Sequence, residues 1–332
     1  MTITVQEITD REKWNGFLTS QPRGHLLQSY EWGELNRYLG GNIYRLGALE
    51  NGRMVGALML SVAQVPLPVS LPGIRLNWLY GSRGPTVEHP ASPALRALLE
   101  QAHVLARKER AVVLRLEPNI ADDDPAIDDW LAAYRALGFQ INPNAVHGRR
   151  SWVLDIRPSA GELLANFKMT WRQNVRSAER KGVVIREAEN DADFDAYYEL
   201  LKVTSERDAF FIHQKDYPRE ILMFGASSNS KRNLKATYLL QYRCLQWAKS
   251  RGCSYFDFRT IPEILEPGEE MWGVYEYKKG FGGFSRLNIP TQDYVYRSLV
   301  YNAWRNFVEM RRARRHAERK KVELERAARG KN

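Results

Sequence analysis

The sequence has 332 residues, of which 44% are hydrophobic and 27% are charged, as in ordinary soluble globular proteins. That length exceeds one typical hydrophobic core, so about two domains are expected. Several classes are excluded: no apolar stretch approaches the ~20 residues of a membrane-spanning helix, no signal peptide opens the chain, and Cys244 and Cys253 have no partners at metal-binding spacing. We therefore expect a cytoplasmic protein that holds no metal.

Positive charge is concentrated at the C-terminus. The formal net charge is +10, and residues 311–332 carry ten Lys and Arg against three Glu, or +7 of that excess. Such a balance suits phosphate-bearing partners, namely nucleic acid, nucleotide-linked substrates or anionic lipid head groups. From Tyr301 onward the composition favours a helix. It is either a solvated helix or a basic arm that touches nucleic-acid or membrane phosphates.

The first half of the sequence alternates strands and helices. Asn51-Gly52 is a strong hairpin turn between two predicted strands, and Ser29 is a candidate N-cap. In chain order the predicted elements are strand 3–8, helices 10–18 and 29–39, strands 43–49, 54–63 and 76–80, helix 93–110, strand 111–116 and helix 125–137.

The second half begins in the same way. Its predicted elements are strand 152–156, one long helix 161–181, strand 183–187, helices 191–206 and 234–250, and strand 254–258. The repeated order predicts two related α/β domains, with a boundary between Asn142 and Gly148. We expect the first at 1–147, the second at 148–300, and a C-terminal basic helix at 301–332. The stretch 222–234 is too short for the hairpin that the first half carries.

One basic segment lies in the long predicted helix. Lys168, Arg172, Arg176 and Arg180 recur every four residues and so form a ridge. Like charges at this spacing repel one another, so a helix that keeps four of them usually gains something from an anion. The ridge is a candidate phosphate-binding surface, with a plain solvated face as the alternative.

Two further segments have the composition of a functional site. Residues 205–213 combine Arg207 with aromatic residues and a histidine, which suits stacking on a ring and pairing with a phosphate. Residues 273–283 are predicted to form an aromatic strand that runs into two lysines and a glycine turn. A lysine held against aromatic rings is partly desolvated and can stabilise a developing oxyanion. The chain has no Gly-x-Ser-x-Gly elbow and no Cys-His signature.

Taken in order, six segments resemble the Fem family of peptidoglycan bridge-forming enzymes, also called lipid II aminoacyltransferases. The resemblance covers nearly the whole chain, and the joint order of the segments makes it specific. The segments are Leu27-Gln-Ser-Tyr-Glu-Trp-Gly33, Tyr80-Gly-Ser-Arg-Gly-Pro85, Trp171-Arg-Gln-Asn-Val-Arg176, Ala178-Glu-Arg-Lys-Gly-Val183, Tyr255-Phe-Asp-Phe258 and Val274-Tyr-Glu-Tyr-Lys-Lys-Gly-Phe-Gly-Gly283.

The resemblance implies an α/β fold of two tandem GNAT-like domains, similar to acyl-CoA N-acyltransferases. It also implies an aminoacyltransferase that moves an amino acid from aminoacyl-tRNA to a stem-peptide amine of a peptidoglycan precursor, lipid II or UDP-MurNAc-pentapeptide. No cofactor is implied beyond the aminoacyl-tRNA co-substrate. We expect a monomer, and any membrane contact is expected to be peripheral.

The same resemblance suggests roles for individual residues. Lys278 would stabilise the tetrahedral oxyanion, Arg207 would hold the precursor's diphosphate, and tRNA would contact basic surfaces such as the ridge. The residues that would line the precursor groove are Ser205, Phe211, Phe224 and Tyr277.

The sequence departs from the family pattern at three places. Asn36 stands where relatives commonly have a substrate-binding lysine, and the adjacent Arg37 is the candidate to replace it. Phe211 and Phe224 stand where relatives often have tyrosines. The family usually has a pair of strands between the segments that correspond to residues 222 and 223 of this chain, and this chain lacks that pair.

Two other functions stay open. An acyl-CoA-dependent N-acyltransferase would need a pyrophosphate loop of the Arg/Gln-x-x-Gly-x-Gly/Ala kind, and the sequence has no clean example. A non-catalytic protein that binds RNA or a cell-wall precursor would agree with the skipped strands and the basic tail, but the retention of Lys278 argues against it. Within the transferase interpretation, Glu88 is a candidate general base.

Overall fold

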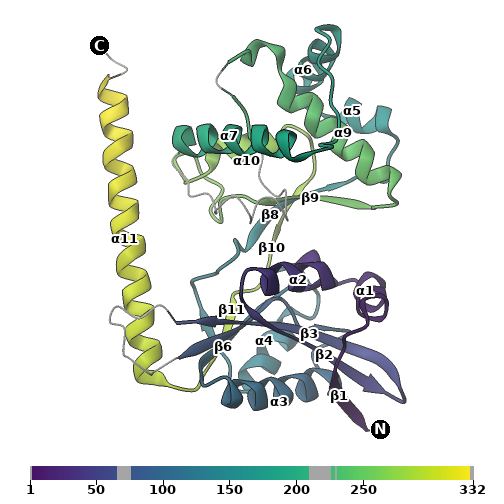
Figure 1. The fold of residues 1–332 in the computed structure, drawn as a ribbon, viewed down its shortest axis with the longest axis vertical. Helices are drawn as coiled ribbons and strands as arrows, with labels where there is room; N and C mark the ends of the chain where they lie inside the picture. Colours follow the sequence, from purple (N-terminus) through teal and green to yellow (C-terminus); the bar gives the residue numbers. More distant parts are fainter. Residues whose placement is uncertain (1, 66–75, 209–225, 229, 330–332) are drawn as a thin grey trace. The chain divides into compact units, whose positions relative to one another are not determined.

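The computed structural model describes residues 2–65, 76–208, 226–228 and 230–329 (Figure 1). The chain divides into two compact units, each with its own hydrophobic core. Unit 1 takes Met1–His147 and Asn288–Asn332, and unit 2 takes Gly148–Leu287.

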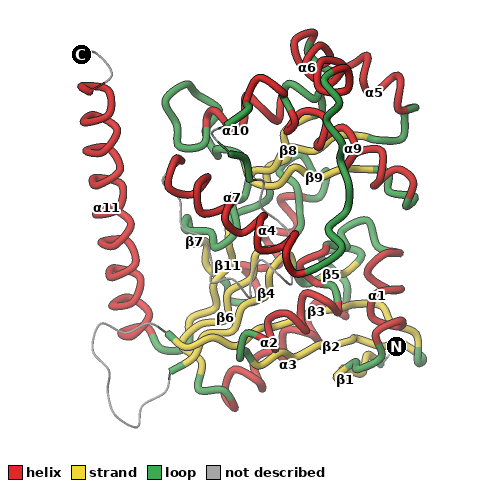
Figure 2. Tube along the Cα trace, turned by 45° about the horizontal axis from the view of Figure 1, so that its top comes forward, coloured by secondary structure: helices red, strands yellow, loops and turns green. Residues whose placement is uncertain are grey.

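Unit 1 is built on one mixed β-sheet (Figures 1 and 2). Its strands are β1 (Ile3–Glu7), β2 (Asn42–Glu50), β3 (Arg53–Gln64), β4 (Asn77–Arg83), β5 (Thr86–Val87), β6 (Ala111–Pro118), β7 (Gln140–Asn142) and β11 (Thr291–Val295). They lie in the order β1-β2-β3-β4-β6-β11-β7, with β5 paired to β3. All neighbours are antiparallel except β4 and β6. The predicted Asn51-Gly52 turn joins β2 to β3, with both residues at positive φ as a two-residue hairpin requires.

Helices cover both faces of this sheet. They are α1 (Arg11–Ser20), the 3-10 turn η1 (Leu26–Gln28), α2 (Tyr30–Tyr38), α3 (Pro93–Lys108) and α4 (Ile127–Ala136). The side chains of Asp10, Ser29 and Ser92 each accept a hydrogen bond from a backbone N–H of the first turn, which explains where α1, α2 and α3 begin. The helices and strands predicted for this half of the chain are all present, with shifts of a few residues at their ends.

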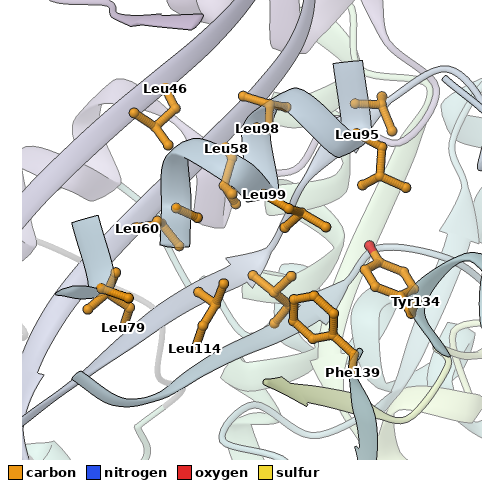
Figure 3. Close-up of a cluster of buried hydrophobic side chains, with 14 of the residues drawn as sticks. Leu46, Leu58, Leu60, Leu79, Leu95, Leu98, Leu99, Leu114, Tyr134 and Phe139 are labelled. Atoms are coloured by element: carbon orange, nitrogen blue, oxygen red, sulfur yellow. The ribbon is translucent and has the colours of Figure 1, made fainter. Parts of the chain in front are cut away.

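The core of unit 1 lies between the sheet and the pair α3 and α4. Leu58 and Leu60 of β3 face α3, whereas Met59 between them faces α2 on the opposite side, because successive strand residues alternate between the two faces. Figure 3 shows these leucines meeting Leu98 and its neighbours on α3. Each fully buried leucine contributes about 1.5–3 kcal/mol relative to an exposed one, so this cluster holds the helices on the sheet.

Gln28 fills the place where β3 and β4 separate. Its fully buried side chain accepts a hydrogen bond from the Met59 N–H at 2.8 Å and donates to the Ser82 carbonyl at 2.6 Å. Neither of these backbone groups has a partner in the β3–β4 ladder, which pairs Ser61 to Gln64 with residues before Gly81. The amide of Gln28 therefore completes the sheet at this point.

The chain returns to unit 1 after unit 2, which corrects the predicted end of the second domain. Because β11 lies between β6 and β7, residues 288–300 belong to unit 1. The helix that follows, α11 (Ser298–Arg329), also starts on unit 1, since Tyr301 and Trp304 are buried against Val112 and Val113. The predicted C-terminal helix is present, but its first turns are part of a core. Among the described residues no helix, α11 included, is long and apolar enough to cross a membrane.

Asp293 of β11 is completely buried and receives hydrogen bonds from three side chains. Arg115 of β6 binds both carboxylate oxygens, with Nε at 2.8 Å and Nη2 at 2.7 Å. Asn142 of β7 and Tyr301 of α11 each donate to Oδ2 at 2.8 Å. One carboxylate thus joins the returning strand to both neighbouring strands and to the helix that follows.

Unit 2 has a smaller antiparallel sheet. Its elements are β8 (Arg150–Asp155), α5 (Ala160–Asn166), α6 (Met169–Arg180), α7 (Asp191–Asp208), the 3-10 turn η2 (Arg232–Leu234), α9 (Ala236–Ser250), β9 (Tyr255–Thr260), α10 (Trp272–Lys279) and β10 (Phe284–Leu287). The strands lie in the order β10-β8-β9. α6 and α9 pack side by side (Figure 2), through buried residues such as Val175 and Leu245.

Two predictions for residues 161–187 of this unit are wrong. The long helix expected at 161–181 is interrupted between α5 and α6, because Phe167 turns into the core and the Lys168 N–H bonds to the Gly280 carbonyl instead of to the preceding turn. The strand expected at 183–187 does not form. Its residues alternate in burial as a strand would, but within the described residues no neighbouring strand pairs with them.

Asp293→Asn is expected to destabilise unit 1 strongly. The variant leaves the Arg115 guanidinium buried without its counter-charge, so the free energy of unfolding should fall by about 3–5 kcal/mol in a denaturant titration. Arg11→Gln is the control: it removes the Arg11–Glu31 ion pair, which is exposed on both sides, and should cost at most about 1 kcal/mol. Equal losses in the two variants would contradict the role given to Asp293.

Candidate functional site

Residues 272–279 form a helix, α10, where an aromatic strand was predicted. Tyr275 and Tyr277 alternate with other residues as in a strand. In the structure, Trp272 and Tyr275 lie one helical turn apart, and the centres of their rings are separated by 5.0 Å. Tyr275 also packs edge-on against Trp152 of β8, with the ring centres 5.5 Å apart. Packing of these rings against the sheet therefore overrides the strand preference of aromatic residues.

The glycines after α10 allow the end of this helix to pack closely against the start of α6. The Gly280 carbonyl accepts a hydrogen bond from the Lys168 N–H at 2.8 Å, and the indole of Trp171 donates to the Tyr277 carbonyl at 2.9 Å. Gly280 lies directly on the Trp171 ring, where a Cβ atom would overlap the indole. Gly283, at φ +98°, lies against the backbone of β8. Close approach and positive φ both require glycine here, and together they fix the C-terminal end of α10.

Tyr277 is packed inside this arrangement. Its ring contacts those of Tyr238 at 5.4 Å and Phe281 at 5.2 Å, and its hydroxyl donates to the Thr237 carbonyl of α9 at 3.0 Å. Burial raises the pKa of Tyr277 well above its usual value. Tyr277 is therefore a neutral side chain that joins α10 to α9, and its place in a precursor groove stays a prediction.

Lys278 extends from α10 to β9. Its Nζ donates to the Thr260 carbonyl at 2.6 Å, and the side chain is partly buried. Burial lowers the pKa of Lys278 to about 8; the Asp257 carboxylate opposes this shift, and the Arg259 guanidinium adds to it. At pH 7 the charged form still predominates by about tenfold. An ammonium in such a desolvated place interacts more strongly with a developing negative charge than one in water.

The predicted precursor-binding residues begin at the end of α7. Arg207 donates from Nη1 to the carbonyl and to the hydroxyl of Ser227, both at 3.3 Å. Ser205, two residues earlier, is half-buried. Phe211 and Phe224 lie outside the described residues. The structure thus anchors the guanidinium of Arg207 within unit 2, and the binding roles of these four residues stay predictions.

The basic ridge splits into two parts. Lys168 precedes α6 and places its ammonium 5.1 Å from the centre of the Trp171 ring, and Arg172 donates to a backbone carbonyl of α5. Arg176 and Arg180 are exposed, and in the described part of the chain neither makes a hydrogen bond or an ion pair. The first two cations are used within the fold, and the last two are available to a ligand.

More basic residues lie next to the free end of the ridge. Lys181 donates from Nζ to the Asn233 carbonyl at 2.6 Å, which places η2 beside the end of α6. Together these residues form what we call the α6–η2 basic surface: Arg176, Arg180, Lys181, Lys231, Arg232 and Lys235, all exposed. The sequence pattern did not reveal this surface, because its two halves are about fifty residues apart in the chain.

In unit 1, Arg37 and Asn36 form contacts within their own helix, and Glu88 lies on the surface. Arg37 pairs with Glu34 at 2.8 Å, and the amide of Asn36 donates to the Trp32 carbonyl at 2.7 Å. Glu88 is exposed and lines an open depression of about 510 Å³. Nothing in these contacts points to a ligand, so the binding role of Arg37 and the base role of Glu88 stay predictions.

Sequence reasoning missed the groups that surround Lys278. Asp257 belongs to the segment 255–258 that carries part of the resemblance, so that segment could have drawn attention to it. The Thr260 carbonyl leaves no signal, because every residue has one. Among the described residues, no group of three or more His, Cys, Asp or Glu side chains could hold a metal ion.

Known proteins resemble this chain over most of its length. A sequence model of the FemAB family matches residues 9–222 and 218–308. The lipid II:glycine glycyltransferases of Staphylococcus aureus strains USA300 and Mu50 are each 29% identical to it over 403 residues, which cover 89% of this chain and 93% of the relative. Among solved structures, FemX has a TM-score of 0.80 at 20% identity, covering 90% of this chain and 99% of FemX. The likeness to FemX confirms the expected α/β fold.

The same matches bear on the skipped strand pair. An alignment of 403 positions exceeds the 332 residues of this chain by 71, so the relative has at least that many residues without a counterpart here. The family model matches in two stretches that meet at residues 218–222, next to the point where the sequence predicts the omission. The family model thus matches this chain in two stretches that overlap beside the predicted omission, and the omission itself stays a prediction.

Gly280→Ala is expected to displace Trp171 and to loosen the end of α10. Its Cβ would overlap the indole ring, so we expect a loss of about 1–3 kcal/mol in unfolding free energy. Gly273→Ala, in the same helix and with no atom within 4 Å of its new Cβ, is the control. It should be neutral or up to about 1 kcal/mol more stable. Two variants of equal stability would show that Gly280 is not needed for close packing.

Proposed function

This chain belongs to the FemAB family, and we propose that it is an aminoacyltransferase of peptidoglycan bridge formation. In this proposal it takes the aminoacyl group from aminoacyl-tRNA and joins it to a side-chain amine of a precursor's stem peptide. The proposal is supported by the family match and by the relatives named lipid II:glycine glycyltransferase. The observation that carries the chemistry is the partly desolvated Lys278 at the end of α10.

The proposed reaction places modest demands on the protein. The aminoacyl ester is already activated, and an unprotonated amine is a good nucleophile, so the enzyme must position both and stabilise the oxyanion of the tetrahedral intermediate. The Lys278 ammonium supplies the positive charge for that oxyanion. Its bond to the Thr260 carbonyl holds the side chain in one place before the substrate arrives.

Precursor and tRNA would use different surfaces of unit 2. We assign the diphosphate of the precursor to Arg207, whose guanidinium is held at Ser227. We assign the tRNA backbone to the α6–η2 basic surface, because a row of exposed cations binds phosphates without reading sequence.

Lys278→Met is expected to abolish most of the activity. The protein is incubated with a lipid-linked or nucleotide-linked precursor and a pool of charged tRNAs, and added residues on the stem peptide are measured by mass. We expect kcat to fall by about 10²–10³-fold, as when an oxyanion-stabilising group is removed. The control is Lys279→Met, which removes an exposed ammonium that lies 5.2 Å over the Tyr275 ring and should change kcat by less than about threefold.

The pH dependence gives a second measurement of the same role. The pKa of Lys278 is lowered to about 8, so the charge is present below that pH and is lost above it. Wild-type kcat should therefore decline as the pH rises through about 8, and in Lys278→Arg the decline should move to higher pH. Absence of product from wild-type protein with every tRNA would refute the proposed function. A fully active Lys278→Met would refute the role of the lysine alone.

Replacing Arg176 and Arg180 together by Ala is expected to weaken tRNA binding and to leave precursor binding unchanged. Each phosphate contact makes the slope of log K against log salt steeper by about 0.7–0.9. The slope measured for the double variant in a salt titration should therefore be shallower than that of the wild type by about 1.5. A matched control replaces Arg96 and Arg135, two exposed arginines of unit 1, by Ala. If both double variants bind tRNA equally, the α6–η2 basic surface is not the tRNA site.

A further inference from the structure

Strand β9 of unit 2 contains one residue more than regular pairing with β8 allows. The register between the two strands shifts, because Ser151 of β8 lies opposite Thr260 whereas Val153 lies opposite Asp257. Trp152, between the two β8 residues, therefore faces two residues of β9 instead of one. An extra residue of this kind is a β-bulge, and bulges are common beside active sites, where they redirect a nearby group.

The backbone of the bulge is strained at Arg259, which has a φ of +67°. A residue with a side chain rarely adopts this left-handed conformation, because its Cβ atom comes too close to the following carbonyl oxygen. The Asp257 carboxylate offsets the strain, since its Oδ1 accepts a hydrogen bond from the Arg259 N–H at 2.6 Å. Strained backbone held in this way occurs preferentially at functional sites. The residue that follows it is Thr260.

The extra residue decides the direction in which the Thr260 carbonyl points. Before the bulge, the Ile156 N–H donates to the Ser254 carbonyl at 2.9 Å, and hydrogen-bonded pairs alternate with non-hydrogen-bonded pairs from there. Regular pairing would bring Thr260 opposite Arg150 in a hydrogen-bonded pair, with its carbonyl facing β8. In the structure Ile261 takes that place, because its N–H donates to the Arg150 carbonyl at 3.0 Å. The carbonyl of Thr260 consequently points away from β8.

The carbonyl that the bulge turns away from β8 is the one that binds Lys278. Nζ of Lys278 donates to it at 2.6 Å. Asp257 also lies close enough for its charge to favour the ammonium form of the lysine, and Arg259 opposes it. The bulge thus supplies both the hydrogen-bond acceptor of Lys278 and the nearest negative charge.

The charges that act on Lys278 come from β9 alone among the described residues. Side chains of the neighbouring elements are engaged elsewhere: that of Arg150 donates to the Ser285 hydroxyl at 2.7 Å, and that of Arg172 donates to a carbonyl of α5. The charged residues that belong to β8, to the start of α6 and to α10 near this point are Arg150, Lys168, Arg172, Glu276 and Lys279.

We propose that Asp257 is a positioning residue for Lys278, through the bulge that it maintains in β9. This inference rests on the proposed function, because the direction of the ammonium matters where an oxyanion forms. Asp257 holds Arg259, the extra residue turns the Thr260 carbonyl outward, and that carbonyl orients the Lys278 ammonium. A positive charge fixed before the reaction stabilises the developing oxyanion without having to reorient.

The electrostatic part of the proposal is tested on the protein alone with Asp257→Asn. The amide oxygen of asparagine can still accept from the Arg259 N–H, but the negative charge is gone. The titration midpoint of Lys278 should therefore fall by about half a pH unit or more. It is measured by ¹³C NMR of lysine-labelled protein, in which the Lys278 signal is identified by its loss in Lys278→Met.

The matched control for this titration is Asp155→Asn. It removes another carboxylate of the same sheet, one that pairs with Arg157 instead of acting on Lys278. The midpoint of Lys278 should stay at the wild-type value in this control. An unchanged midpoint in Asp257→Asn, or equal shifts in the two variants, would overturn the proposal.

The structural part is tested by hydrogen exchange of the Arg259 amide. Asp257→Ala removes the acceptor, so this amide should exchange at least about tenfold faster than in the wild type. In Asp257→Asn, which keeps an acceptor, the rate should stay within about threefold of the wild-type rate. Wild-type exchange in the alanine variant would show that the carboxylate does not hold the bulge, and the proposal would fail.

The pH profile of the reaction connects the bulge to catalysis. The Lys278 charge is lost above a pH of about 8 in the wild type and at lower pH in Asp257→Asn. In that variant kcat should be nearly unchanged at about pH 6.5 and about twofold lower at about pH 8. Asp257→Ala should lower kcat by about tenfold at every pH with KM within about threefold, because the ammonium is no longer held in place.

Full activity of Asp257→Ala, or a wild-type pH profile in Asp257→Asn, would contradict the positioning role. If wild-type protein forms no bridged product with any charged tRNA, the proposed function fails. The titration of Lys278 and the exchange of the Arg259 amide still decide, in that case, whether Asp257 maintains the bulge and acts on the lysine.

Discussion

The architecture of unit 1 depends on one buried carboxylate. Asp293 is on the strand that enters the sheet last, and its partner Arg115 lies 178 residues earlier in the chain. The ion pair is favourable only because both carboxylate oxygens and the guanidinium are satisfied, since a buried charge without a partner would cost several kcal/mol. Through Asn142 and Tyr301 the same group determines where β7 and α11 meet the sheet.

Much of unit 1 could be predicted from sequence, because its signals are local. The Asn51-Gly52 turn, the Ser29 cap and the apolar stripe of α3 each specify their element within a few residues. The return of β11 could not be predicted in this way. Residues 291–295 form a short strand whose partners are determined only by the completed sheet, so the pattern gave no reason to separate them from the second domain.

For Lys278, the sequence predicted the partial burial of the side chain but not the local structure around it. Lys278 was singled out correctly as a partly desolvated lysine, yet its segment is a helix, because the rings of Trp272 and Tyr275 pack against the sheet. The break at Phe167 has a similar cause: no glycine or proline marks it, and only the Gly280 carbonyl explains why the Lys168 N–H leaves the helix.

The insertion of unit 2 between β7 and β11 has a consequence for synthesis on the ribosome. All of the sequence of unit 2 emerges before β11 does, so the unit that begins first is completed last. Until residue 293 leaves the exit tunnel, Arg115 has no carboxylate partner and the gap between β6 and β7 stays unfilled. Unit 2 can fold during this interval, since all three strands of its sheet lie within residues 150–287. Nascent unit 1 would meanwhile expose the edge of β6, an unpaired strand that chaperones and other chains can recognise.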